Sequence, residues 1–299
     1  MRRPGFDLSQ KTLRRRDFLK GGLSLAAGVA TLGPSRLLAD NQDTYTRWAF
    51  LSDTHIAADP DNHYRGFYPY RNLREISGQI AYNLPDGLVI TGDLARLRGQ
   101  TAAYENLKTL LAPVSEKRPI CLGVGNHDDR GDFFQAFGDS VGTDTAVENK
   151  HVIASTVGPV RLIVLDSLLF VDSNPGLLGQ PQRIWLQTFL EMSDETPTIL
   201  FFHHTPRRDL LDGRRLFDII GPASKVKAVV YGHSHKYSFS QYQGIHLINL
   251  PATGYNMSGR QPVGWMEAWL SARSGEFLLH AIGGNRRMDG RAKKLYWRT

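Results

Sequence analysis

Histidine, aspartate and asparagine residues recur at a few short points of this 299-residue sequence, always just after an apolar run. Carboxylate and amide oxygens combined with imidazoles suit Fe, Mn, Zn or Co, and the chemistry of such a site is activation of water. Five segments share this arrangement: Asp53-Thr54-His55, Gly92-Asp93, Gly125-Asn126-His127-Asp128, His203-His204 and Gly232-His233-Ser234-His235. Together they predict a metal centre.

Each segment alone also has an ordinary structural explanation. Asn and Asp favour turns, and a pair of histidines can be buried in a core. The five in this order favour the metal instead, and a glycine beside a ligand lets the backbone turn sharply. Cys121 is the only cysteine, which excludes a cysteine-based metal site and an internal disulfide.

The apolar runs before these segments predict the strands of an α/β fold. Strands are expected within 47–52, 86–93 and 118–129, with helices over 70–82 and 101–113, the second stopped by Pro113. Binding sites in α/β sheets lie beyond the carboxyl ends of the strands. Five such ends could therefore deliver the polar side chains to one place.

The second half of the chain has a different pattern, and one domain built on two sheets is expected. A hairpin is expected over 151–167, a helix over 180–192, and strands within 196–206 and 225–235. The last four apolar runs, within 237–243, 245–251, 265–272 and 276–282, are typical of antiparallel strands. The apolar face of the 180–192 helix would consist of Ile184, Trp185, Leu186, Phe189 and Leu190. The basic stretch 285–299 is expected to be a solvated tail.

The first 39 residues resemble a bacterial twin-arginine export signal. Arg15-Arg16 precedes "DFLK" and a short Gly- and Ala-rich apolar stretch, and cleavage is expected after Ala39. The signal would engage the twin-arginine translocation machinery and give a periplasmic or secreted protein, with residues 40–299 as its single domain. A basic amphipathic helix is the alternative.

The basic charge of the sequence lies mostly in this signal. Residues 1–39 hold eight of the 36 Lys and Arg residues and two of the 29 Asp and Glu residues, which leaves 28 basic and 27 acidic side chains. A nearly neutral domain gives no argument for nucleic-acid binding. The sequence also has no apolar run of the roughly 18 residues that a membrane span needs, so no membrane anchor is expected.

Residues from about Trp48 to Ile282 resemble the calcineurin-like metallophosphoesterase superfamily. The order of the five motifs carries this resemblance. "GNHDDR", "LDS", Gln182-x-x-Trp185-Leu186 and "HHTP" are most similar to its cyclic-nucleotide and glycerophosphodiester phosphodiesterases. The resemblance implies an α/β fold, a four-layer αββα sandwich of two mixed β-sheets flanked by helices, with a two-metal site at the strand ends.

The resemblance also implies a role for each matching residue. Asp53, His55 and His235 would bind one metal ion, and Asn126, His203 and His233 the other, with Asp93 bridging both. His127 would contact the phosphate without binding metal, Asp128 would orient His127 or support its loop, and His204 would lie behind the ligands. The "LARLRG" stretch after Asp93 lacks an acidic residue that some relatives have there.

The function implied is hydrolysis of a small phosphate ester by a hydroxide bound to two divalent or mixed-valence ions. A phosphodiester is the expected substrate, and a phosphomonoester or a pyrophosphate-linked compound is the alternative. A catalytically silent metal-binding scaffold is a further alternative, against which the complete ligand set argues. The metal, the natural substrate and the oligomeric state stay open.

Overall fold

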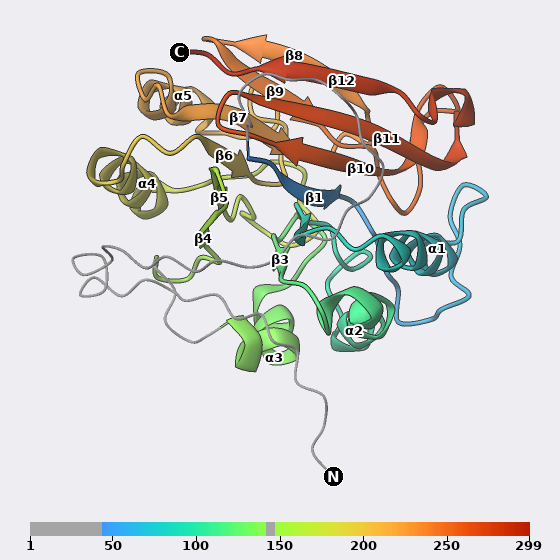
Figure 1. Cartoon of the computed structure of the whole chain (residues 1–299). Helices are drawn as coiled ribbons and strands as arrows, with labels where there is room; N and C mark the ends of the chain where they lie inside the picture. Colours follow the sequence, from blue (N-terminus) through green and yellow to red (C-terminus); the bar gives the residue numbers. More distant parts are fainter. Residues whose placement is uncertain (1–43, 142–146) are drawn as a thin grey trace.

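A computed structural model describes residues 44–141 and 147–299, which fold into two facing six-stranded sheets with helices on their outer sides (Figure 1). The expected export signal, residues 1–39, lies outside the described residues. Among the described residues, no helix is long and apolar enough to cross a membrane.

The first sheet has the order β12-β11-β10-β1-β2-β3. β1, β2 and β3 are parallel, and β10 continues the sheet antiparallel to β1. The strands are β1 (Thr46–Leu51), β2 (Gly87–Ile90), β3 (Ile120–Leu122), β10 (Pro262–Leu270), β11 (Ser274–Gly284) and β12 (Ala292–Tyr296). The first three therefore end at the same edge, as the sequence predicted.

The second sheet has the order β4-β5-β6-β7-β9-β8. β5, β6, β7 and β9 are parallel, while β4 and β8 form antiparallel edges. The strands are β4 (Ile153–Val157), β5 (Val160–Val164), β6 (Thr198–Phe201), β7 (Val226–Tyr231), β8 (Ser238–Tyr242) and β9 (Ile245–Asn249). The predicted hairpin is confirmed as β4 and β5.

Alternation along β1 explains why the two sheets stack. Trp48 and Phe50 point into the apolar core between the sheets, whereas Ala49 and Leu51 pack with the helices of the outer layer. Three helices cover the first sheet: α1 (Pro69–Tyr82), α2 (Thr101–Ser115) and α3 (Arg130–Val141). Two cover the second: α4 (Gln180–Met192) and α5 (Gly213–Ile220). The predicted four-layer sandwich is confirmed.

Two helix predictions need correction. Pro113 does not stop α2, which continues to Ser115; a proline one turn from the end removes a single intrahelical hydrogen bond. Ile184 is 54% exposed and does not belong to the buried face of α4, which contains Leu186 and Leu190. The sequence analysis predicted neither α3 nor α5.

Two strand predictions also need correction. β9 is antiparallel to β8 as expected, but it is parallel to β7, because the chain runs from β7 to the edge strand β8 and returns as β9 between the two. The basic stretch at 285–299 is not a solvated tail. It contains the short 3-10 helix η2 (Arg286–Met288) and β12, and it buries Leu295 and Trp297 against the core between the sheets.

Candidate metal centre

The ends of five strands bring all the predicted metal-binding side chains together. Asp53 and His55 follow β1, and Asp93 follows β2. Asn126 follows β3, His203 follows β6, and His233 and His235 follow β7. The parallel strands of both sheets end on the same side of the sandwich, so the side chains that follow them meet there. All seven side chains are buried except that of His233, which is partly buried.

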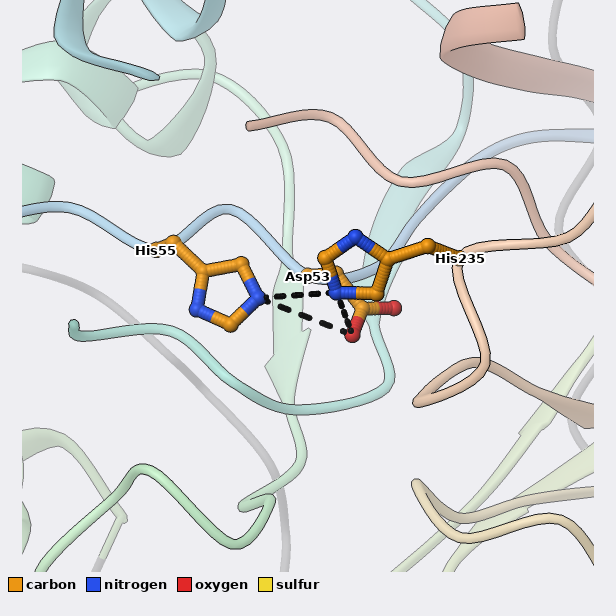
Figure 2. Close-up of side chains that lie close together, drawn as sticks. All are labelled: Asp53, His55 and His235. Carbon is orange, nitrogen blue, oxygen red and sulfur yellow. Dashed lines mark hydrogen bonds and ion pairs between the residues drawn. The ribbon is translucent and has the colours of Figure 1, made fainter. Parts of the chain in front are cut away.

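A first group consists of Asp53, His55 and His235 (Figure 2). Asp53 Oδ1 lies 3.2 Å from His235 Nε2 and 3.8 Å from His55 Nε2. The two Nε2 atoms are 3.1 Å apart. The ligand atoms therefore converge on one point, as the three sides of a single cation site would.

A second group consists of Asp93, His203 and His233. Asp93 Oδ2 lies 3.2 Å from His203 Nε2. Asn126 joins this group, because its Oδ1 lies 2.9 Å from His233 Nδ1. The amide oxygen of Asn126 therefore lies beside His233, which is expected to bind the same ion.

Asp93 links the two groups. The same oxygen that faces His203 lies 3.7 Å from His55 Nε2. His203 Nε2 in turn lies 3.9 Å from Asp53 Oδ1. One carboxylate placed between two sets of ligands can hold two cations a few ångströms apart.

Two buried atoms of the site lack a hydrogen bond within the described part of the chain, and this fits cations at the site. Asp53 Oδ1 and His203 Nε2 are fully buried, and neither has a hydrogen-bond partner among the described residues. Buried polar atoms are rarely left without a partner, so these two atoms call for one that a metal ion can provide. Two carboxylates, one amide and four imidazoles form a donor set suited to Fe, Mn, Zn or Co.

Charges inside the site shift the pKa values of its members. Burial alone would raise the pKa values of Asp53 and Asp93, but the neighbouring histidines hold both well below their usual range. Burial opposes protonation of His203, yet Asp93 and Asp53 raise its pKa to about 9. Burial dominates at His55 and lowers its pKa to about 3. The site thus favours ionised carboxylates, which are the form that binds metal.

Backbone conformation aims these side chains. Asp53, His55, Asp93, His233 and His235 all have positive φ angles, between 47° and 66°. Non-glycine residues in this region are uncommon and cluster at functional sites. The sharp turns were expected at the neighbouring glycines, but the candidate ligands themselves have the positive φ angles.

The neighbouring glycines allow close approach instead. A Cβ atom on Gly232 would overlap Ser52 and Asp53, and one on Gly125 would overlap Asp93. The ligand-bearing loops therefore pack against each other more tightly than a side chain would permit.

His127 lies beside both groups. Its ring belongs with His55 and Asp93 to a third possible trio of ligand atoms, and its backbone N–H donates to Asp93 Oδ1 at 2.9 Å. Its Nδ1 lies 2.8 Å from the Leu97 carbonyl oxygen and 3.6 Å from Asp172 Oδ1. A proton on Nδ1 would leave Nε2 free to meet a substrate.

Asp128 is hydrogen-bonded to the loops after β2 and β3. Its carboxylate accepts hydrogen bonds from the backbone N–H groups of Leu94, Ala95 and Gly125 and from the Tyr104 hydroxyl, at 2.8–3.1 Å. Burial and the nearby charge of Asp93 raise its pKa to about 6. These contacts favour the support of the loops after β2 and β3 over the orientation of His127.

His204 lies behind the ligands, as expected. Its Nδ1 is 2.8 Å from Ser167 Oγ, and its ring packs against those of His203 and His233. Three other groups that contact the site histidines were not predicted from the sequence. They are the carbonyl of Leu97, the carboxylate of Asp172, and Tyr255. The Tyr255 carbonyl oxygen lies 2.6 Å from His235 Nδ1, and its ring stacks on His55. Backbone acceptors leave no signal in a sequence, because any residue type can supply them.

Comparison with known families gives one match that spans most of the domain. The family described as "Calcineurin-like phosphoesterase" matches residues 46–237. This range contains all nine predicted site residues, from Asp53 to His235.

Curated relatives carry phosphodiesterase names. A Rhodococcus erythropolis protein named "Probable cyclic nucleotide phosphodiesterase" is 31% identical over 227 residues, covering 72% of this chain and 73% of that protein. The Pseudomonas aeruginosa 3',5'-cyclic adenosine monophosphate phosphodiesterase CpdA is 27% identical, covering 68% and 74%. The Enterobacter lignolyticus glycerophosphodiester phosphodiesterase GpdQ is 25% identical, covering 69% and 76%.

Solved structures share the fold. A dimetal phosphatase from Danio rerio superimposes with a TM-score of 0.66 at 15% identity, covering 85% of this chain and 98% of that one. A purple acid phosphatase from yellow lupin gives a TM-score of 0.61 at 15% identity, covering 85% and 54%.

Proposed function

The chain belongs to the calcineurin-like phosphoesterase family and is a metal-dependent phosphoester hydrolase, and from this premise we propose that it hydrolyses phosphodiesters. The observation that carries the proposal is the pair of ligand groups joined at Asp93. The relatives named as cyclic-nucleotide and glycerophosphodiester phosphodiesterases support a diester over other phosphate esters.

Asp53, His55 and His235 would hold one cation, and Asn126, His203 and His233 the other, with Asp93 shared. When bound, the two cations supply a water that ionises near neutral pH and neutralise charge on the phosphoryl oxygens. The hydroxide expected as the attacking group belongs to this proposal.

His127 would act on the substrate without binding metal. The Leu97 carbonyl accepts a hydrogen bond from the proton on Nδ1, so in the doubly protonated imidazolium Nε2–H can donate a hydrogen bond to a phosphate oxygen or its proton to the departing alkoxide, which leaves the ring neutral. Its backbone N–H holds Asp93 in place at the same time. Asp128 supports both loops through its four hydrogen bonds, and His204 supports the His203 and His233 rings.

The test compares bis-p-nitrophenyl phosphate with p-nitrophenyl phosphate, before and after metal removal and with Mn or Co restored. We expect a higher kcat/KM on the diester and loss of activity without metal. A preference for the monoester would support the alternative of a phosphomonoesterase. Bound metal without turnover of any phosphate ester, including a pyrophosphate, would support a silent scaffold.

Export through the twin-arginine machinery is a separate part of the proposal, and the motif around Arg15-Arg16 supports it. A folded precursor could load its metals before crossing the membrane. The double substitution Arg15→Lys and Arg16→Lys should keep the protein inside the cell, as measured by fractionation. Arg2→Lys with Arg3→Lys is the matched control and should be exported. Normal export of the first variant would contradict the proposal.

A further inference from the structure

Exposed apolar side chains lie on loops that also contact the candidate metal centre. Among the described residues, Leu97, Phe170, Leu211 and Met257 are 55%, 67%, 64% and 50% exposed. Each lies on a loop outside the strands, in the connections after β2, β5, β6 and β9 respectively. We call these four side chains the apolar rim.

Two rim residues adjoin His127. The Leu97 carbonyl oxygen lies 2.8 Å from His127 Nδ1. Phe170 is two residues before Asp172, whose N–H donates to the Asn126 carbonyl at 2.6 Å and whose carboxylate lies 3.6 Å from His127 Nδ1. This side of the rim is thus fixed to the loop that bears His127.

The other two adjoin the histidines that follow β7. Leu211 is two residues after Asp209, whose Oδ2 lies 3.7 Å from His233 Nε2. Met257 is two residues after Tyr255, whose carbonyl oxygen lies 2.6 Å from His235 Nδ1. Each rim residue therefore lies on a loop that contacts the candidate site.

A cavity of about 360 Å³ extends the rim at Leu97. Its lining includes the apolar side chains of Ala57, Ala58 and Leu97 together with Arg96, Arg98 and Asp172. Leu97 and Asp172 border both the cavity and His127, so the cavity opens beside the expected position of the phosphate. Asp59 also lines the cavity, and Arg98 is ion-paired with Asp172, so the charges largely offset each other. Polar groups next to apolar surface suit a ligand that has both a polar and an apolar part.

We propose that the substrate is an amphipathic phosphodiester in which one of the two alcohols carries an apolar chain. The protein would bind it as a single dissolved molecule, not as part of a micelle. This inference rests on the proposed phosphodiesterase function and narrows it. Single exposed hydrophobic residues are ordinary, but four on loops that all contact one candidate site favour a binding surface there. The apolar chain would cover the rim, while the phosphate meets His127.

The test uses methyl, butyl and octyl p-nitrophenyl phosphate below their micellar concentrations. These esters share one leaving group, so only the apolar chain varies. We expect KM to fall by about tenfold or more from methyl to octyl, since each buried methylene favours binding. The double substitution Leu97→Ser and Phe170→Ser should reduce this ratio to less than about threefold.

The matched control changes two exposed apolar residues on the outer helix α4. Ile184 and Met192 are 54% and 61% exposed and belong to α4, not to the four loops that carry the rim. Ile184→Ser with Met192→Ser should keep the full dependence on chain length. A wild-type KM that does not depend on chain length, or an unchanged dependence in the rim variant, would overturn the inference.

A binding measurement separates this inference from the proposed function. Dimethyl and dibutyl phosphate are titrated calorimetrically into the metal-loaded protein, with tighter binding of the dibutyl ester expected. Tighter binding without turnover of any diester would refute the phosphodiesterase and support the apolar recognition. Turnover without a difference in binding would do the reverse. A wild-type dimer that the rim variant converts to a monomer, seen by sedimentation, would make the rim an interface between copies and overturn the inference.

Discussion

Asp93 is the side chain on which both halves of the candidate site depend. It lies 3.7 Å from His55 and 3.2 Å from His203, and it accepts the backbone N–H of His127. Asp93→Asn removes the charge that offsets two cations, so metal and most activity should be lost together. Metal content per chain and turnover of bis-p-nitrophenyl phosphate measure this.

The control for Asp93 is Asp61→Asn, which changes a carboxylate that is 82% exposed and ion-paired with Arg71. This variant should keep its metal and its activity. Two metal ions per chain and near-normal turnover in Asp93→Asn would show that Asp93 is not shared.

His127 distinguishes chemistry from metal binding. Its neighbour Asn126 faces His233, while its own Nδ1 faces the Leu97 carbonyl. His127→Ala should keep the metal and slow turnover by roughly 10²–10⁴-fold, as expected for a lost general acid. The loss should be smaller for p-nitrophenyl esters, whose leaving group needs little protonation, than for alkyl diesters.

Metal analysis and rates on both ester types decide the role of His127. Equal losses on both types would mean that it binds the phosphate and donates no proton to the leaving group. Loss of metal would mean that it is a ligand. His246→Ala, which removes a ring that contacts the Tyr296 carbonyl outside the site, should change neither measurement.

At the scale of elements, Asp166 ties the loop after β5 to its surroundings. This fully buried carboxylate accepts two hydrogen bonds from Arg130 on α3, at 2.6 Å and 2.8 Å, and lies 3.6 Å from Lys150 Nζ. Asp166→Asn leaves the charges of Arg130 and Lys150 without this carboxylate and should lower the free energy of unfolding by about 3–5 kcal/mol. Urea unfolding at pH 7 measures this.

The contribution of Asp166 should depend on pH. Burial opposes its ionisation, but the hydrogen bond from Arg130 and the charge of Lys150 hold its pKa below the usual 3.8. A lowered pKa in the folded state means that the stabilisation is complete above pH 3.8 and is lost as the pH falls through the folded-state value. The difference between wild type and Asp166→Asn should therefore shrink only below about pH 4.

The control for Asp166 is Asp61→Asn, because Asp61 and its ion-pair partner Arg71 are 82% and 55% exposed. An exposed pair should contribute no more than about 1 kcal/mol. A loss of similar size in both variants would contradict the role assigned to burial.

Most strands and the meeting of the candidate ligands at one site could be predicted from the sequence, because apolar runs and polar strand ends are local patterns. Residues 180–192 were predicted with the bounds of α4. β12 was missed because only Leu295 of its five residues is buried, so an edge strand of this kind reads as a charged tail. The positive φ angles of Asp53 and His235 could not be predicted, because distant loops that pack together impose them.

At the scale of the whole molecule, Arg298 connects the two sheets. It follows β12 of the first sheet, and its guanidinium donates to the carbonyl oxygens of Ile220, Gly221 and Val226 beside α5 and β7 of the second. Arg298→Ala leaves these carbonyls without their partner and should lower the free energy of unfolding by about 1–3 kcal/mol. Urea unfolding measures the loss.

Lys294→Ala is the matched control on β12, since Lys294 forms an ion pair with Glu276 in which both side chains are more than 40% exposed. Its effect should stay within about 0.5 kcal/mol. Equal stability of the Arg298 variant and the wild type would show that the two sheets hold together without this connection.

The pairing of β1 with β10 has a consequence for biosynthesis. Thr46 of β1 lies opposite Leu270 of β10. More than 200 residues separate the two strands, so the second edge of β1 stays uncovered until all of them have been translated. A nascent chain stalled before β10 exposes an open apolar strand edge, the kind of surface that chaperones shield. Pulse-labelled ribosome-bound chains should become protease-resistant over β1 only after residue 270 has left the exit tunnel. The completed first sheet is therefore a late product of translation, whatever order the helices follow.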